Sequence, residues 1–358
     1  MSTINVGVIG TGWCGGMRAE TAADSPLVGD LHISEVNEDR LKEVQAKTGA
    51  VTATTDYRDI LAIDDVDAVL ISATPETLHY PMTKEAFEAG KHVLLEKPIA
   101  LTLAEADELI ELADARGLKF TIGYSQRFND KQALVKRSID DGTLGEPISA
   151  LVSRHITRKL GDKIGGRILL SPAAMETTHD IDWLLWCLEP RRAVRVYGQA
   201  VEKVMKPKYG TQDMMSIIVT LDDGTVLNFQ SGWMLPPGWP NYSSTWIEVF
   251  GSEGVLILDD SHRDTVLHTM SDGTQFPLST MPGEQAAHVY AGPMHEETLH
   301  FIDAVARDRE VLCKPDEARR AMEVYLAADL SAYRNEPVDL PLTREEEKAA
   351  IEVGIKEA

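Results

Sequence analysis

Cysteine is scarce in this sequence, which has only Cys14, Cys187 and Cys313. These residues lie far apart and form no C-x-x-C pair, so their spacing excludes a disulfide framework and a zinc knuckle. The segment HEETLH at residues 295–300 is similar to H-E-x-x-H, but its fifth position is Leu299, so one helix face cannot present two histidines to zinc. We therefore expect a reducing compartment and no bound metal.

Long apolar runs and basic runs are missing too. No stretch approaches the 18 or so continuous apolar residues of a membrane span, and MSTINVGVIG enters a strand-like segment without the features of a signal peptide. There is no run of five Lys or Arg, and 35 basic against 57 acidic residues give a formal net charge of −22. This charge repels phosphate backbones and anionic membranes. We expect a cytoplasmic protein that binds neither nucleic acid nor membrane.

The composition is that of a folded soluble protein. Hydrophobic residues make up 43% of the chain and charged residues 26%, which excludes global disorder. A length of 358 residues exceeds the usual size of a single hydrophobic core, so two domains are expected.

The first 124 residues alternate between two periodicities. Short β-branched runs predict strands at Ile4–Ile9, Leu31–Val36, Ala68–Ile71, His92–Leu95 and Phe120–Ile122. Between them, apolar residues at helical spacing predict helices at Thr83–Glu88 and Leu103–Ala115, the second behind a capping box of Thr102 and Glu105. Such alternation indicates an α/β domain, residues 1–124, in which helices cover both faces of a parallel sheet.

After Arg127 the pattern changes to strands joined by short loops. The predicted strands are Ile148–Thr157, Ala193–Val204, Ser216–Leu221, Val226–Ser231, Thr245–Phe250 and Val255–Leu258. Asp223-Gly224 predicts a tight hairpin turn between two of them. Helices are expected at Asp130–Asp140, Ile181–Leu188, Glu296–Asp308 and after Thr343. Residues 125–358 are therefore predicted to form an α+β domain with a mainly antiparallel sheet.

A glycine-rich turn directly follows the first predicted strand. It comprises Gly10, Gly12, Trp13, Cys14 and Gly15 in G-x-G-x-x-G spacing. The glycines permit a tight turn, a close approach to a pyrophosphate and close packing of the following helix. Glu35, which closes the next strand, is placed to accept hydrogen bonds from a ribose 2′-hydroxyl and to repel a 2′-phosphate. The pattern therefore predicts a site for NAD rather than NADP.

Two further motifs end strands of the same domain. Glu96-Lys97-Pro98 follows the strand HVLL, and Thr74, Pro75 and His79 follow the strand AVLI. Open α/β sheets bind ligands at the carboxyl ends of their strands, so a lysine there either lies beside the nicotinamide and the reacting hydroxyl or is an ordinary surface residue.

Together with GYSQRFND at residues 123–130, these motifs resemble the glucose–fructose oxidoreductase / inositol dehydrogenase / MocA (Gfo/Idh/MocA) family. The resemblance covers essentially the whole chain, including IEVFGSEGVLILDD and HFIDAVARDRE. It implies a Rossmann domain and an open-faced antiparallel sheet that often serves oligomerisation, here into a dimer or tetramer. It also implies nicotinamide-dependent oxidation or reduction of a sugar or cyclitol carbinol, with Thr74, Pro75, His79, Glu96 and Lys97 at the cofactor.

The segment METTHDIDWLLWCL carries the third motif of the resemblance. The family usually has an acidic residue, three others and then His-x-x-Asp at the start of a helix. His179 and Asp182 match this motif, but Met175 stands where the acid is expected. Glu176, one residue out of step, and Asp180 are the alternative sources of a carboxylate.

The resemblance assigns catalysis to two residues. His179 accepts the hydroxyl proton in oxidation, which suits an imidazole with an unperturbed pKa near 6.5. Lys97 hydrogen-bonds the same oxygen and stabilises developing negative charge.

Substrate recognition is predicted around a basic segment, RHITRKLGDKIGGR. Its basic residues are Arg154, His155, Arg158, Lys159, Lys163 and Arg167. They either pair with the acidic surface as a solvated loop or hold an anionic sugar. Arg127, Glu176 and Asp180 are further substrate-binding candidates. Aromatic residues around LPPGWP, Trp233, Trp239 and Tyr242, either stack on a sugar ring or pack in a core or interface.

Three functions remain open at this point. The first is an NAD-dependent sugar or cyclitol dehydrogenase. The second is an NAD-dependent glycosidase of the same family, which oxidises its sugar transiently and eliminates the aglycone. The third is a non-catalytic NAD-sensing regulator, against which Glu96, Lys97 and His179 argue.

Overall fold

The computed structural model describes residues 3–164, 169–239, 243–259, 267–271, 273–275, 284–286 and 289–356. It divides the chain into two compact units, Met1–Phe128 with Thr280–Arg319, and Asn129–Ser279 with Arg320–Ala358. The expected division into residues 1–124 and 125–358 differs from these units mainly in residues 280–319, which return to the first unit. The reason is apolar packing, because this later segment contributes a helix to the first core.

The first unit is built around six strands. In chain order its elements are β1 (Ile4–Ile9), α1 (Trp13–Asp24), β2 (Val28–Ser34), α2 (Glu38–Thr48), β3 (Thr52–Thr54), α3 (Tyr57–Leu61), β4 (Ala68–Ile71), a 3₁₀ turn (Glu76–Leu78), α4 (His79–Glu88), β5 (His92–Leu95), α5 (Leu103–Arg116), β6 (Phe120–Ile122), a second 3₁₀ turn (Ser125–Phe128), β16 (Glu284–Ala286), β17 (Val289–Ala291) and α10 (Pro293–Ala306).

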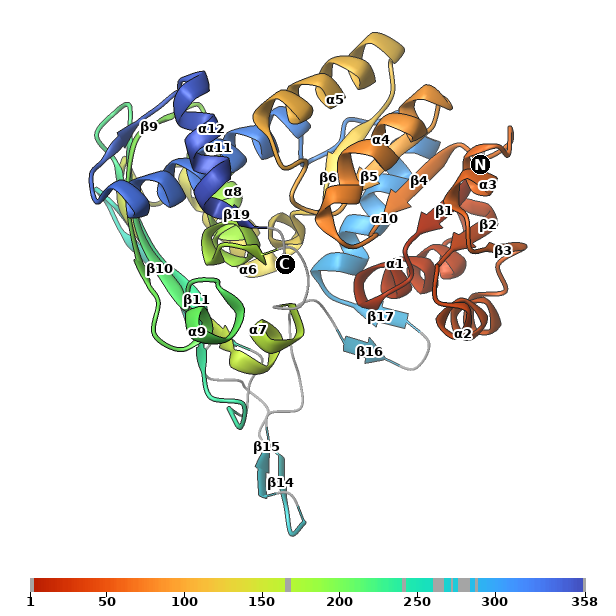
Figure 1. The fold of residues 1–358 in the computed structure, drawn as a ribbon, viewed down its shortest axis with the longest axis horizontal. Helices are drawn as coiled ribbons and strands as arrows, with labels where there is room; N and C mark the ends of the chain where they lie inside the picture. The colour runs from red at the N-terminus through yellow and green to blue at the C-terminus, as the bar shows by residue number, and fades with distance from the viewer. Residues whose placement is uncertain are drawn as a thin grey trace. The chain divides into compact units, whose positions relative to one another are not determined.

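The strands of this sheet lie in the order β3-β2-β1-β4-β5-β6, and all neighbours are parallel (Figure 1). This is the order of doubly wound dinucleotide-binding domains, in which ligands bind at the carboxyl ends of the strands. Gly10 after β1, Glu35 after β2 and Glu96 after β5 therefore lie along one edge of one sheet. The predicted parallel sheet is confirmed.

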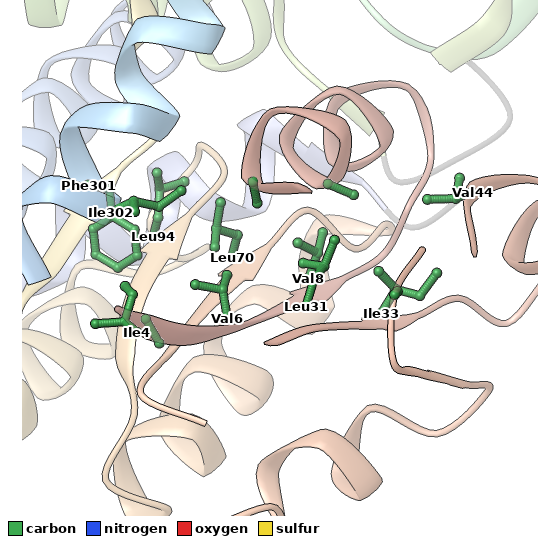
Figure 2. Close-up of a cluster of buried hydrophobic side chains, with 14 of the residues drawn as sticks. Ile4, Val6, Val8, Leu31, Ile33, Val44, Leu70, Leu94, Phe301 and Ile302 are labelled. Atoms are coloured by element: carbon green, nitrogen blue, oxygen red, sulfur yellow. The ribbon is translucent and has the colours of Figure 1, made fainter. Parts of the chain in front are cut away.

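Helices cover both faces of the six-stranded sheet. On one face, Val6 and Val8 of β1 pack in a buried cluster with residues of α1 and α2 and with Phe301 and Ile302 of α10 (Figure 2). On the other face, Gly7 leaves room for α3, since a Cβ at Gly7 would stand 2.6 Å from Cγ2 of Ile60. Burial of these apolar side chains on both sides stabilises the layer at roughly 25 cal/mol per Å² of apolar surface.

The second unit contains a larger sheet. Its elements are α6 (Asp130–Asp140), β7 (Pro147–Thr157), α7 (Arg158–Ile164), β8 (Leu169–Leu170), a π-helical turn (Ala173–Thr177), α8 (Thr178–Cys187), β9 (Ala193–Val201), α9 (Met205–Tyr209), β10 (Met214–Leu221), β11 (Val226–Leu235), β12 (Ser243–Gly251), β13 (Val255–Asp259), β14 (Leu267–Thr269), β15 (Gly273–Gln275), β18 (Val338–Asp339), α12 (Arg344–Gly354) and β19 (Ile355–Lys356). Helix α11 (Pro315–Arg334) begins in the first unit and continues in the second.

Seven strands form the sheet of the second unit, in the order β13-β12-β7-β11-β10-β9-β18. Neighbours are antiparallel except β7 and β11, which are parallel. The expected α+β architecture with a mainly antiparallel sheet is thus confirmed. The one parallel pair was not predicted, because it joins strands that are distant in the chain.

The two faces of this sheet differ in burial. On one face α11 approaches β9 so closely that a Cβ at Gly198 would stand 2.4 Å from the carbonyl oxygen of Ala328. On the other face of β12 and β13, Trp246, Phe250 and Ile257 are exposed by 37%, 40% and 50%. The sheet is therefore open on one side, as the family resemblance implies.

Most predicted local signals are present in the structure. Capping boxes form at Thr102 with Glu105 and at Thr343 with Glu346, and Asp223-Gly224 lies in the turn between β10 and β11. Helix α11 was not predicted. Among the described residues, no helix is long and apolar enough to cross a membrane.

Candidate functional site

The glycine-rich turn joins β1 to α1 as the motif predicts. Gly10 has φ +80°, a conformation that favours glycine. A Cβ at Gly15 would stand 1.8 Å from the carbonyl oxygen of Gly10, so only glycine allows this approach of helix to turn. At Gly12, the N-cap of α1, a Cβ would meet no described atom within 4 Å. The turn therefore leaves open space at a helix N-terminus, which fits a dinucleotide phosphate.

Glu35 lies beside this turn at the end of β2. Its Oε2 accepts a hydrogen bond of 2.8 Å from the backbone N–H of Thr11, and its Oε1 accepts one of 3.1 Å from the N–H of Asn37. Arg40 of α2 donates from Nε to the carbonyl oxygen of Thr11 at 2.8 Å and from Nη2 to that of Gly12 at 3.2 Å. A carboxylate and a guanidinium thus flank the turn where an adenosine ribose is expected.

His79 is buried rather than open to a ligand. Its Nδ1 lies 2.7 Å from the carbonyl oxygen of Pro98, and its Nε2 lies 3.2 Å from that of Ala73. Burial lowers the pKa of His79, and the contacts with the two carbonyl oxygens oppose that shift. A carbonyl oxygen can only accept, so Nδ1 donates the shorter of the two bonds to Pro98. His79 therefore ties the segment after β5 to the segment after β4, which carries Thr74 and Pro75.

Glu96 and Lys97 follow β5 directly, and Lys97 is half-buried. Glu96 accepts two hydrogen bonds at Oε1 from Arg18 of α1, from Nε at 3.0 Å and from Nη2 at 2.6 Å. Cys14 lies one helical turn before Arg18, and the charges of Glu96 and Lys97 both act on the pKa of its thiol. Burial, with a smaller contribution from Glu96, raises the pKa of the Cys14 thiol to about 12, so this thiol stays protonated. The expected cofactor residues of β1, β2 and β5 thus gather at one sheet edge.

Arg127, a candidate for substrate binding, is buried in the first unit. Its guanidinium pairs with the carboxylate of Glu317 and donates a hydrogen bond of 3.2 Å from Nη1 to the carbonyl oxygen of Leu312. Trp13, the first residue of α1, is 50% exposed beside the glycine-rich turn.

In the second unit, His179 lies in the first turn of α8 and is half-buried. The π-helical turn of residues 173–177 directly precedes this helix and contains Met175 and Glu176. π-Helical turns are rare and frequent at functional sites. Met175 packs against a buried cluster of Ile156, Met205 and Trp233.

The two carboxylates that were alternatives to the missing acid each have a partner. Glu176 is buried and accepts a hydrogen bond of 3.0 Å at Oε1 from Nε1 of Trp233. Asp180 accepts one of 2.9 Å at Oδ2 from Nε of Arg154, which also donates to the carbonyl oxygen of Glu176. Burial raises the pKa of the Asp180 carboxyl, and the adjacent Arg154 guanidinium opposes that rise. Arg154 therefore contacts Glu176 and Asp180, which lie on either side of His179 in the chain.

The rest of the basic segment is divided among several environments. Arg158 begins α7, and its Nε is buried without a hydrogen-bond partner among the described residues. Lys159 is exposed. Arg167, the Lys163 side chain and Tyr242 lie outside the described residues. Of the flanking tryptophans, Trp233 is a core residue at 2% exposure and Trp239 is 38% exposed.

Three charged residues that surround the predicted ones were not predicted from the sequence. Arg40 contacts the glycine-rich turn, and Arg18 and Glu297 surround Glu96. The available signal for Arg18 was its position four residues after Cys14, on the same face of a helix that must pack on the sheet.

A segment of each unit matches a known protein family. Residues 4–124 match a model described as an oxidoreductase family with an NAD-binding Rossmann fold, and residues 133–257 match the GFO/IDH/MocA C-terminal domain. The inositol 2-dehydrogenase/D-chiro-inositol 3-dehydrogenase of Shouchella clausii is 30% identical over 95% of each chain. The myo-inositol 2-dehydrogenase of Thermotoga maritima is 29% identical over 75% of this chain and 79% of its own.

Solved structures give the same fold. The scyllo-inositol dehydrogenase of Lactobacillus casei, crystallised with NAD(H) and scyllo-inositol, superposes with a TM-score of 0.81 over 94% of this chain and 99% of its own. The myo-inositol 2-dehydrogenase of Lactobacillus plantarum gives a TM-score of 0.81 over 95% and 100%. Each is 20% identical, so these likenesses show the fold alone. The prediction of an NAD-binding Rossmann domain is confirmed by the match over residues 4–124.

Proposed function

Since this chain belongs to the Gfo/Idh/MocA family of oxidoreductases, we propose that it is an NAD-dependent dehydrogenase that oxidises a ring carbinol of a neutral cyclitol or sugar. The observation that carries the proposal is the common sheet edge of the glycine-rich turn, Glu35 and Lys97. The relatives named for inositol oxidation support the substrate class.

Each catalytic residue contributes a different step. When bound, NAD supplies the acceptor for the hydride that leaves the carbinol carbon. Lys97 donates a hydrogen bond to the carbinol oxygen and stabilises the negative charge that develops there. His179 takes the hydroxyl proton during oxidation and returns it during reduction.

A neutral substrate is favoured over an anionic one by the pairing of the arginines. Arg154, a candidate for holding an anion, pairs with Asp180, and Arg127, a candidate for substrate binding, pairs with Glu317. Arg158 is the residue of the basic segment that we propose for substrate contact, through a hydrogen bond from its guanidinium to a hydroxyl group.

The function is tested by absorbance at 340 nm with a panel of substrates. Purified protein is incubated with NAD or NADP and with myo-, scyllo- and D-chiro-inositol, neutral and anionic monosaccharides, and nitrophenyl glycosides. We expect NADH to accumulate with at least one neutral cyclitol or sugar. Preferential use of anionic sugars would contradict the neutral-substrate assignment.

The same panel separates the two alternative functions. Release of nitrophenol without net NADH would identify a glycosidase that returns its hydride. Binding of NAD with no turnover of any compound would indicate a regulator. Either outcome would overturn the dehydrogenase proposal.

Replacement of Glu35 by serine is expected to move cofactor preference toward NADP by at least tenfold in the ratio of kcat/KM values. The substitution removes the carboxylate that repels a 2′-phosphate, while Arg40, with a side chain 28% exposed, remains next to the turn. Steady-state kinetics with both cofactors measures the change. A wild-type enzyme that already prefers NADP tenfold would contradict the role of Glu35.

We propose that the open face of the second unit's sheet joins copies of this chain into a dimer or tetramer. Its β12 and β13 expose Trp246, Phe250 and Ile257, and exposed apolar patches are typical of interfaces. Light scattering coupled to gel filtration should show that Ile257→Glu lowers the oligomer mass, whereas Val51→Glu, at an exposed position of the first unit, leaves it unchanged. A monomeric wild-type protein would contradict this assignment.

A further inference from the structure

Arg18 is the most deeply buried charged group of the first unit's sheet edge. Its side chain is 0% exposed and forms ion pairs of 2.6 Å with Glu96 and 2.7 Å with Glu297. Its Nη1 also donates a hydrogen bond of 3.0 Å to Oγ1 of Thr298. Burying a guanidinium is costly unless it is paired and hydrogen-bonded, and here three side chains satisfy it.

These contacts connect three structural elements near the edge of the first sheet where the carboxyl ends of its strands lie. Arg18 belongs to α1, the helix that starts at the glycine-rich turn, whereas Glu96 follows β5 and Glu297 lies on α10. Gly123, after β6, leaves room for the pair, since a Cβ there would stand 3.1 Å from both Nη2 of Arg18 and Oε2 of Glu96. The position of Glu96 is therefore set by the helix that carries the cofactor turn.

Lys97 lies between two anchored neighbours. On one side, the Glu96 carboxylate accepts two charge-assisted hydrogen bonds from Arg18. On the other side, the carbonyl oxygen of Pro98 accepts the hydrogen bond from Nδ1 of His79. A shift of the Lys97 backbone relative to α1 would strain the contact between Arg18 and Glu96, and a shift relative to α4 would strain the contact between His79 and Pro98.

We propose that Arg18, held by Glu297, is a positioning residue that fixes Lys97 relative to the glycine-rich turn by clamping Glu96. Arginine suits this role because its planar fork donates to two carboxylates at once, which the single ammonium of lysine does with less directional control. The catalytic contribution of Arg18 is indirect, and the inference rests on the function proposed above for Lys97. A substitution far from the reacting atoms that misplaces a catalytic group by about 1 Å can cost about 10²-fold in rate.

The test compares Arg18→Lys with wild type in kcat, substrate KM, NAD dissociation constant and melting temperature. We expect kcat to fall about 10- to 100-fold, with the NAD dissociation constant changing less than about threefold. Glu297→Gln, which keeps an oxygen acceptor for Arg18, should show a smaller loss of kcat. Arg319→Met is the matched control, because Arg319 pairs with Asp107 at 2.8 Å between α11 and α5, and it should keep the wild-type kcat.

A purely structural role would lower the melting temperature of Arg18→Lys and leave kcat per folded enzyme unchanged, which would overturn the proposal. Hydrogen exchange by mass spectrometry supplies a readout that does not need turnover. Arg18→Lys should increase exchange in peptides covering residues 96–101, and Arg319→Met should not. If wild type oxidises no carbinol, the proposed function fails, while unchanged exchange at residues 96–101 refutes the clamp itself.

Discussion

Substituting alanine for Lys97 or for His179 will lower the kcat of carbinol oxidation by about 10²-fold or more in each case. The Lys97 variant loses the hydrogen bond that stabilises charge on the carbinol oxygen. The His179 variant loses the group that accepts the hydroxyl proton. Both side chains are half-buried, so truncation removes chemistry without removing a core side chain. Steady-state rates of NADH formation at saturating substrate measure the loss.

Two exposed residues provide matched controls for these substitutions. Lys42, on α2 with a side chain 71% exposed, and His268, on β14 and also exposed, should tolerate alanine with kcat within about twofold of wild type. NAD titration separates binding from chemistry, because a catalytic role predicts a larger change in kcat than in the NAD dissociation constant. Wild-type turnover by either Lys97→Ala or His179→Ala would show that its assigned role is wrong.

The first sheet could be predicted from the sequence because its central strands are buried on both faces. Ala68–Ile71 and His92–Leu95 are almost wholly apolar, and their predicted bounds coincide with β4 and β5. Strand β2 begins at Val28, three residues before the predicted start at Leu31. The prediction started late because Gly29 and Asp30 are exposed and break the apolar run.

Helix α11 was not predicted from the sequence. All residues from 321 to 331 are buried, and they include the acidic residues Glu323 and Asp329. Polar residues mark the solvent side of a helix only where they are exposed, and these two are not. Local sequence pattern therefore does not show which residues of this helix the fold covers.

The candidate site shows the same limit. Glycine spacing and Glu35 could be recognised because their functional geometry is local to the consecutive elements β1, α1 and β2. Arg18 and Glu297, in contrast, are 279 residues apart in the chain, and only the packing of α10 on the first unit brings them together. Likewise, the sequence marked Arg154 as basic but not that Asp180 neutralises it.

Replacing Arg154 by methionine should destabilise the protein by about 3–5 kcal/mol, the range for removing one member of a buried ion pair. Arg154 and Asp180 have side chains only 4% and 2% exposed, and they lie 2.9 Å apart. The variant leaves the Asp180 carboxylate in the interior without its cation. Urea unfolding of Arg154→Met measures the loss, and Arg195→Met is the control, because Arg195 and its partner Asp339 are both exposed.

The loss of folding stability in Arg154→Met is expected to depend on pH. Burial raises the pKa of the Asp180 carboxyl, and the variant lacks the guanidinium that opposes this shift. A folded-state pKa above the unfolded value favours folding while the group is protonated, and that contribution is lost as pH rises through the folded-state pKa. The deficit relative to wild type should therefore be smallest in acid and grow toward neutral pH. The double variant Arg154→Met/Asp180→Leu should regain much of the stability, whereas equal urea midpoints for Arg154→Met and wild type at neutral pH would refute the buried ion pair as a source of stability.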